Sequence, residues 1–449
     1  MRTVLVILVI LVILVMSTML KLLLLWPAAE LPLRQDQLQY VEGAVAISET
    51  GVPKYSNPVW DEAHASPLYP YGLAAHHKVF GPEGFLTAAR VTQVLLSALT
   101  ALLVYFISLR LFGRKNALLS LAAVAFFPTF IAYSHYLFTE TVYTFLLVGL
   151  VAHLLARDES PSPGHALAAG FIAGLAALTR GAFILQVPFV LLWLLSRRGG
   201  VGKQRAMACA AFLLGMAGTI APWSIRNTLH HGEFLLIDTN GGNVLHKNWN
   251  VLPPENHDVG MREWGEYKYR YRGEIPFRER VTEENIVRRS ELETRAAVQF
   301  TLAHPLLFAR NSVIRAANLA NPTSFLVRTI RRGGYAGLPP LLAEVLVWMV
   351  LLSTMAVLGF GTLGLIARLP TYSQLLPMLL IAGNVVVCVL IVSMSRYRFP
   401  MMPLLIPFAV EAALHARVIA TERGTGWWIS LGIIALMSVA WFMYIPYSL

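Results

Sequence analysis

The sequence predicts an all-α polytopic membrane protein with about eleven transmembrane helices and an outside loop domain. Two observations predict this fold class. The 449 residues are 56% hydrophobic and only 14% charged, with a mean hydropathy of +0.59, and a soluble domain of this size could not hide so much apolar surface. In addition, many apolar runs approach or exceed the roughly 20 residues that a helix needs to cross a bilayer.

The first apolar run, residues 3–26, is predicted to be a retained span. It is longer than the roughly 7–15 apolar residues of a signal peptide, and no A-x-A cleavage site follows it. Ten further runs complete the expected set: 87–112, 116–136, 141–156, 165–180, 182–196, 206–221, 340–366, 373–394, 400–418 and 426–446.

Basic residues in the short loops predict the orientation, because Lys and Arg are enriched on the cytoplasmic side. They follow the second, sixth, eighth and tenth runs: Arg110, Arg114, Lys115, Arg197, Arg198, Lys203, Arg205, Arg368, Arg417 and Arg423. We therefore expect a multi-pass membrane protein with a cytoplasmic N-terminus and a C-terminus on the outside.

This topology divides the chain into three predicted parts. Residues 1–221 are predicted to form a transmembrane module with a first outside loop at 27–86, residues 222–339 an outside loop domain, and residues 340–449 the C-terminal transmembrane helices.

Two stretches of the outside loops have the spacing of helices. Residues 281–320 carry periodic apolar residues among charges, which predicts amphipathic helices on the membrane surface. In the first loop, Tyr40, Ala44 and Ile47 would share one face of a helix. The loop domain also holds a run rich in aromatic residues at 264–271.

Composition argues against several other classes. The net charge of +11 fits loops beside anionic lipid rather than nucleic-acid binding, because no basic helix or aromatic-basic module is present. Cys209 and Cys388 lie inside apolar runs, so neither a disulfide framework nor a CxxC metal site is predicted. The motifs H-E-x-x-H and G-x-S-x-G are absent from the sequence.

Arginines in the predicted outside loops break the charge rule. Arg180 lies in Thr179-Arg180-Gly181, and Arg396 and Arg398 lie in Ser395-Arg396-Tyr397-Arg398-Phe399-Pro400. A charge beside hydrocarbon costs several kcal/mol unless it has a partner or a task. Lipid-headgroup anchoring or an intramembrane ion pair would explain one such arginine, but two loops together with Arg226 favour a shared anion site, since guanidinium suits phosphate.

Two acids share the predicted side with these arginines. Asp36 lies about ten residues beyond the first span and could serve as a general base, although a helix cap is the commoner role of one such Asp. Glu140 begins the fourth span, where capping of the helix dipole could also explain an acid. Asp61, in Asp61-Glu62-Ala63-His64, is a weaker competitor as base or metal ligand.

These pieces occur in an order that resembles a known family. They are Asp36-x3-Tyr40-x3-Ala44, Pro67-Leu68-Tyr69-Pro70-Tyr71, Ala89-Arg90, Arg110-Leu111-Phe112-Gly113-Arg114, Thr139-Glu140, Leu178-Thr179-Arg180, Pro222-Trp223-Ser224-Ile225-Arg226-Asn227, Thr239-Asn240-Gly241-Gly242-Asn243 and Ser395-Arg396-Tyr397-Arg398-Phe399-Pro400. The series resembles the membrane-embedded GT-C glycosyltransferases, in particular the branch of protein O-mannosyltransferases, lipid A aminoarabinose transferases and related bacterial lipopolysaccharide glycosyltransferases.

The resemblance implies an inverting glycosyltransferase that moves a sugar from a polyprenyl-phosphate donor to a glycolipid, glycan or protein acceptor. It also implies a bacterial inner-membrane protein whose active site faces the periplasm. It implies Asp36 as the base and Glu140 as the second acid. The remaining assignments are donor-phosphate binding by Arg396, Arg398, Arg180 and Arg226, and substrate positioning by Tyr40, Tyr69, Tyr397 and Asn227.

The chain departs from the family pattern at two places. Gln37 replaces the second acid of an Asp-Glu pair, and Ala65-Ser66 precede Pro67 where Lys is common. Because of these two departures, a contact with the donor phosphate and a dependence on metal cannot be carried over from the family pattern. The sequence therefore requires no cofactor, and a divalent metal stays open.

Two other function classes compete with the transferase. A flippase of lipid-linked sugars would also need arginines facing phosphate, but transporters place charges near the midplane and use paired repeats. A non-catalytic membrane scaffold would need no acids and arginines gathered on one side.

Overall fold

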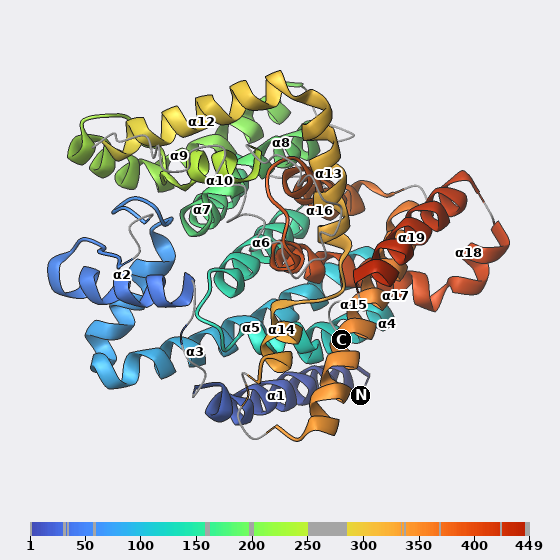
Figure 1. Ribbon diagram of the computed structural model, residues 1–449. Coiled ribbons are helices and arrows are strands. Elements are labelled where there is room, and N and C mark those ends of the chain that lie inside the picture. Colours follow the sequence, from blue (N-terminus) through green and yellow to red (C-terminus); the bar gives the residue numbers. More distant parts are fainter. Residues whose placement is uncertain are drawn as a thin grey trace.

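The computed structural model describes residues 2–29, 33, 36–56, 60–157, 162–196, 202–249, 285–333, 335, 338–367, 370–422 and 424–444. Within these ranges the chain is helical and contains no strand. This confirms the predicted all-α fold class, and Figure 1 shows the helices in a bundle with α6 near its centre. The helices are α1 (Arg2–Ala29), α2 (Asp36–Thr50), α3 (Leu68–Phe112), α4 (Arg114–Phe126), α5 (Pro128–Tyr133), α6 (Glu140–Ala156), α7 (Pro163–Thr179), η1 (Gly181–Gln186), α8 (Val187–Leu195), α9 (Gly202–His231), α10 (Asn240–Trp249), α12 (Ile286–Ala303), α13 (Pro305–Ala320), α14 (Phe325–Arg331), α15 (Pro340–Ile366), α16 (Tyr372–Leu390), η4 (Ser395–Met401), α17 (Met402–Leu414), α18 (Ala416–Glu422) and α19 (Thr425–Tyr444).

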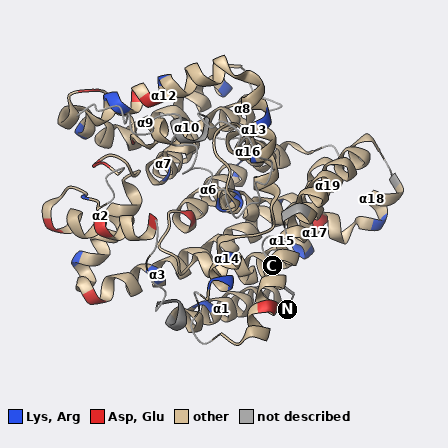
Figure 2. Ribbon diagram, viewed as in Figure 1, with Lys and Arg blue, Asp and Glu red and all other residues tan. Residues whose placement is uncertain are grey.

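Six helices in the described ranges are long and apolar enough to cross a membrane: α1, α3, α9, α15, α16 and α19. Three shorter apolar stretches cover residues 140–156, 163–179 and 181–195. The predicted count of eleven spans is not confirmed. Figure 2 shows that most of the ribbon carries no charge, as expected for a multi-pass membrane protein.

The predicted span at 116–136 is wrong as one continuous helix. The chain forms α4 and then α5, and Phe127 between them is extended, with φ −65° and ψ 122°. Pro128 is the reason, because proline lacks an N–H and pushes the preceding residue out of the helical region. The break makes the chain turn within the bundle just before the Glu140 segment.

The predicted helix in the first loop is confirmed as α2. Ala44 and Ile47 are buried against the start of α3, and Tyr40 packs on the same cluster. The helix α3 is itself bent at Gly81, whose φ of 71° favours glycine, and Pro82 follows it. Residues 68–80 therefore lean away from the rest of α3 and support α2.

Helices α7 and α9 pack backbone against backbone. A Cβ on Gly170 would lie 2.0 Å from the carbonyl oxygen of Phe212, and one on Gly215 would lie 2.1 Å from that of Leu167. Only residues without a side chain allow this approach, which is typical of small residues at helix interfaces in membranes. The close packing fixes the end of α7, where Arg180 follows.

The helical prediction for 281–320 is confirmed in the described part by α12 and α13. The following helix, α14, begins at Phe325, with the Ser324 side chain capping its N-terminus. The aromatic run at 264–271 lies outside the described residues.

Candidate active site

Four breaks between helices meet around one cluster of charges. Asp36 is the first residue of α2 and Glu140 the first of α6, where acids stabilise the helix dipole. Arg180 is the C-cap of α7, with extended backbone at φ −147° and ψ 108°. Arg396 lies in η4, a 3₁₀ helix between the apolar helices α16 and α17. The sequence therefore places each charge where regular helix stops.

Ion pairs connect these four side chains. Arg396 Nη2 lies 2.6 Å from Asp36 Oδ2, and Arg396 Nε lies 3.7 Å from Glu140 Oε1. The same oxygen of Glu140 lies 3.5 Å from Arg180 Nη1. Arg396 thus bridges both acids, and Glu140 bridges both arginines.

The two acids differ in exposure. The Glu140 side chain is 2% exposed, whereas that of Asp36 is 30% exposed. A buried carboxylate between two guanidinium groups is suited to hold them in place. An exposed carboxylate can reach a molecule that arrives from water, so the geometry separates a holding acid from an accessible one.

Aromatic rings cover the faces of both guanidinium groups. The Tyr397 ring centroid lies 5.2 Å from Arg180 Cζ and 5.4 Å from Arg396 Cζ. Phe138 also lies 5.5 Å from Arg396, and Tyr143 lies 5.7 Å from Arg180. Cation–π contacts of this kind stabilise and orient the arginines. The sequence analysis did not assign Phe138 or Tyr143 a role.

Tyr40 and Tyr69 form the edge of the cluster nearest α2. Their rings meet edge to face with centroids 5.2 Å apart, and the Tyr69 hydroxyl donates to Gln93 Oε1 at 3.1 Å. Burial, and then the charges of Asp36 and Glu140, raise the pKa of Tyr40. Its hydroxyl therefore stays protonated and remains a hydrogen-bond donor beside the acids.

Gln37 links the two acidic segments. Its side chain is buried, and its Oε1 accepts a hydrogen bond of 3.0 Å from the Leu137 backbone N–H. A neutral amide suits a buried position beside Asp36 because it adds no further negative charge. The bond fixes the start of α2 against the segment that leads into Glu140.

The structure does not bring Arg398 into this cluster. Its buried guanidinium donates to the Leu319 carbonyl at 2.9 Å and to the Asn321 carbonyl, at the end of α13. Carbonyls at a helix C-terminus lack partners within the helix, and a cation satisfies them well. Arg398 thus ties η4 to α13.

Arg226 and Asn227 lie in a separate group near the end of α9. Arg226 donates to Asn227 Oδ1 at 2.7 Å and stacks over the Trp223 ring at 5.2 Å. The Trp223 ring in turn meets Tyr71, with centroids 5.6 Å apart. These contacts join α9 to the first loop rather than to the Asp36 cluster.

Asp61 joins the first loop to the second. Its carboxylate accepts from Thr239 Oγ1 at 2.9 Å and from the Ala63 N–H at 3.0 Å, and it pairs with Arg289 of α12. Burial raises the pKa of Asp61, against the opposing effects of Thr239 and Arg289. The Asp61 carboxylate oxygens are bonded to neighbouring residues, so a structural role linking the two loops explains this residue better than a role as base or metal ligand.

A second polar connection lies beside Arg180. Ser66 donates to Asp238 Oδ2 at 2.5 Å and accepts from the Gly181 N–H at 2.9 Å. Burial raises the pKa of Asp238 to about 6. Asp238 could not be predicted as part of this connection, because its partner Ser66 lies 172 residues away in the chain.

The described residues contain no group of three or more His, Cys, Asp or Glu side chains that could hold a metal ion. Around the Asp36 cluster the carboxylates face guanidinium groups instead.

Part of the chain that contains site residues matches a known protein family. Residues 63–225 match the family model of dolichyl-phosphate-mannose-protein mannosyltransferase. This stretch contains Tyr69, Glu140 and Arg180. A search of curated protein sequences finds no match.

The archaeal oligosaccharyltransferase shares the fold of this chain at low sequence identity. The Archaeoglobus fulgidus oligosaccharyltransferase in the apo form has a TM-score of 0.55 and 13% identity, covering 99% of this chain and 56% of that chain. The same archaeal enzyme, AglB, in complex with an inhibitory peptide and a dolichol-phosphate has a TM-score of 0.51 and 13% identity, covering 98% and 56%. ArnT from Cupriavidus metallidurans in the apo state has a TM-score of 0.40 and 16% identity, covering 93% and 79%.

This chain spans about half the length of the archaeal enzyme that it matches, 56%. The predicted resemblance is confirmed to this extent: residues 63–225 match the family model of dolichyl-phosphate-mannose-protein mannosyltransferase, and the overall fold is similar to that of the archaeal oligosaccharyltransferase.

Proposed function

We propose that this protein is an inverting glycosyltransferase that takes a sugar from a polyprenyl-phosphate donor. The acceptor would be a lipopolysaccharide, another envelope glycan or a protein hydroxyl on the periplasmic face of the inner membrane. The observation that supports this most is the pairing of an exposed acid, Asp36, and a buried acid, Glu140, on one arginine, Arg396. The dolichol-phosphate bound to the archaeal relative supports a lipid-phosphate donor.

In this proposal Asp36 is the general base. It takes the proton of the acceptor hydroxyl while that oxygen attacks the anomeric carbon and the bond from this carbon to the phosphate oxygen breaks. The phosphate leaves with the electron pair, and a single displacement inverts the anomeric centre. The 30% exposure of the Asp36 side chain gives an acceptor access to the base.

Arg396 and Arg180 hold the leaving phosphate. Negative charge builds up on the phosphate oxygens as the bond breaks, so fixed guanidinium groups stabilise the transition state more than the ground state. Glu140 positions both arginines, and Tyr397 lies against both of their faces. Arg398 and Arg226 support the surrounding helices in this scheme, because their guanidinium groups are bonded elsewhere.

The decisive experiment is sugar transfer by the purified protein in detergent. Radiolabelled polyprenyl-phosphate sugars would be offered one at a time with a glycolipid extract from a strain that lacks the gene. We expect a covalent product with the wild type, and Asp36→Asn should lower kcat by about 10² to 10⁴. The donor KM should change little, because Asp36 acts on the acceptor.

Two results would contradict the proposal. Full activity of a correctly inserted Asp36→Asn protein would remove the base assignment. Movement of the donor across vesicle bilayers without any covalent product would favour a flippase. Mass spectrometry of envelope glycolipids from the deletion strain would identify the acceptor.

A further inference from the structure

The charges of the described cluster cancel. Asp36 and Glu140 carry two negative charges, and Arg180 and Arg396 carry two positive charges, all joined by ion pairs. A donor phosphate would add negative charge to this neutral group, and more as it leaves. At membrane level an additional cation would therefore stabilise the bound donor.

Helix α14 carries such a cation. Phe325, its first residue, packs against Phe138 and Tyr136, with ring centroids 5.5 and 5.1 Å apart. Arg328 is three residues further along, and residues three apart lie on the same side of a helix. Arg328 thus lies on the side of α14 that carries Phe325, whose partner Phe138 covers Arg396 with its own ring.

Among the described residues, the Arg328 guanidinium has no ion-pair or hydrogen-bond partner. Its side chain is exposed. Arg331 on the same helix, by contrast, pairs with Glu344. The Tyr136 ring, which packs on Phe325 of α14, also meets the Tyr133 ring with centroids 5.7 Å apart, so Tyr133 lies in the same region as α14.

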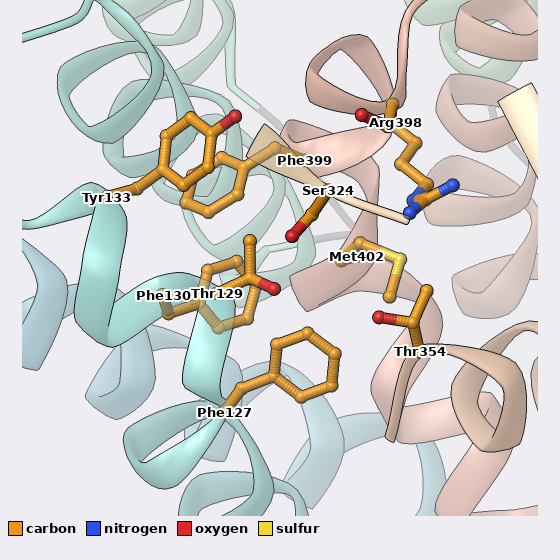
Figure 3. A pocket seen from close by; sticks show the side chains of 10 residues that line it. Phe127, Thr129, Phe130, Tyr133, Ser324, Thr354, Arg398, Phe399 and Met402 are labelled. Atoms are coloured by element: carbon orange, nitrogen blue, oxygen red, sulfur yellow. The ribbon is translucent and has the colours of Figure 1, made fainter. Parts of the chain in front are cut away.

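A second observation points to the same place. The Tyr133 side chain is 1% exposed, and its hydroxyl has no hydrogen-bond partner in the structure. The ring stacks on Phe399 at 4.4 Å and borders a narrow cavity together with Ser324 and Ser395. Figure 3 shows the hydroxyl pointing away from Thr129 and Phe127, at the far end of the ring.

A buried hydroxyl without a partner costs free energy comparable to a lost hydrogen bond, so it indicates a missing acceptor. Tyr133 packs on Phe399 of η4, the element that carries Arg396, and through Tyr136 it neighbours α14, which carries Arg328, so an anionic oxygen held by these arginines is the best-suited acceptor. We propose that Arg328 and the Tyr133 hydroxyl bind the phosphate of the lipid-linked donor together with Arg396. This inference rests on the proposed function and deepens it.

Binding of undecaprenyl phosphate by the full-length protein in detergent tests the proposal, with undecaprenol as the uncharged control lipid. We expect the wild type to prefer the phosphate. Arg328→Gln should weaken phosphate binding by about 10- to 100-fold, and Tyr133→Phe by about 3- to 10-fold, as expected for losing a charged and a neutral hydrogen bond. Binding of undecaprenol should not change in either variant.

Two further variants control for charge and folding. Arg310→Gln removes the same charge from an exposed position on α13 and should bind as the wild type does. Arg328→Lys keeps the charge and should recover most of the affinity. If Arg328→Gln and Tyr133→Phe both keep the wild-type preference, the inference is wrong while the lipid-phosphate donor stands. If the wild type itself shows no preference for the phosphate, the donor class fails as well.

Discussion

At the residue scale, chemically similar side chains of the Asp36 cluster have different surroundings and therefore different proposed roles. The two acids share Arg396, yet only Asp36 is open to water. The two arginines share Glu140 and the Tyr397 ring. A change at one member therefore alters the others, and the variants should be distinguishable by which kinetic constant they change.

Glu140→Gln should impair both donor binding and turnover. It leaves Arg180 and Arg396 without their buried counter-charge, and removing one partner of a buried pair costs about 3–5 kcal/mol. We expect a lower thermal midpoint and a donor KM raised at least about 10-fold, in contrast to Asp36→Asn, which should change mainly kcat. Steady-state kinetics with separately varied donor and acceptor would check this. An unchanged donor KM would contradict the positioning role of Glu140.

Asp238 predicts a pH dependence of stability. Its pKa is raised from 3.8 to about 6, mainly by burial, so the folded state holds the proton more tightly than the unfolded chain. Stability should therefore fall as pH rises from about 4 through about 6, by at most about 3 kcal/mol at 1.36 kcal/mol per pKa unit. Partial exposure of the side chain lowers this bound.

Asp238→Asn should remove this dependence, because the amide stays neutral while its oxygen can still accept from Ser66. Thermal unfolding in detergent between pH 4 and 7 would show a flatter profile for the variant. Parallel profiles for variant and wild type would mean that another group causes the dependence.

At the scale of elements, sequence patterns predicted which segments carry the charges of the site. They predicted less well which of these side chains are in contact. Asp36 and Arg396 were found because charges at the ends of apolar spans are costly. Arg398, two residues from Arg396, was likewise predicted to bind the donor phosphate. In a 3₁₀ helix residues two apart point about 120° apart, so the two side chains of η4 reach different neighbours. That helix type could not be read from the sequence.

Long-range contacts between the loops were also beyond the sequence. Asp61 and Arg289 pair across more than two hundred residues, and no local pattern encodes such a partner. The helices α2, α12 and α13 were predictable because their apolar periodicity is local. Pro128 is visible in the sequence, but hydropathy alone merged α4 and α5 across it.

The packing of α7 on α9 can be tested through its glycines. Gly170→Ala would place a methyl group 2.0 Å from the Phe212 carbonyl oxygen, so the helices must separate. We expect a loss of about 1–3 kcal/mol in stability, typical of overpacking, and lower activity because Arg180 follows α7. Thermal unfolding and transfer assays would measure both effects.

Gly218→Ala is the matched control on α9, because its Cβ would meet nothing within 4 Å. It should be neutral or stabilise the helix by up to about 1 kcal/mol. Equal losses in the two variants would show that contact between α7 and α9 is not the cause.

At the scale of the whole molecule, the proposed function needs the cluster and the loops on one side of the membrane. With Cys209 and Cys388 replaced, single cysteines at Glu49 of α2 and Arg310 of α13 should react with a membrane-impermeant maleimide added outside intact spheroplasts. A cysteine at Lys115, after α3, should react only after permeabilisation. Labelling of Glu49→Cys and Arg310→Cys from opposite sides would exclude a shared site.

The guanidinium groups of the cluster are already paired with carboxylates, and this affects which anions the site can bind. An ion arriving from bulk solvent must compete with the carboxylates that already contact these guanidinium groups, and it has no hydrocarbon tail to retain it at the site. A ligand tethered by a hydrocarbon tail meets the same obstacle at a far higher local concentration, because the bilayer retains it. The ion pairs of the unliganded protein should therefore disfavour the binding of free inorganic anions and favour anionic ligands that are also anchored in the bilayer.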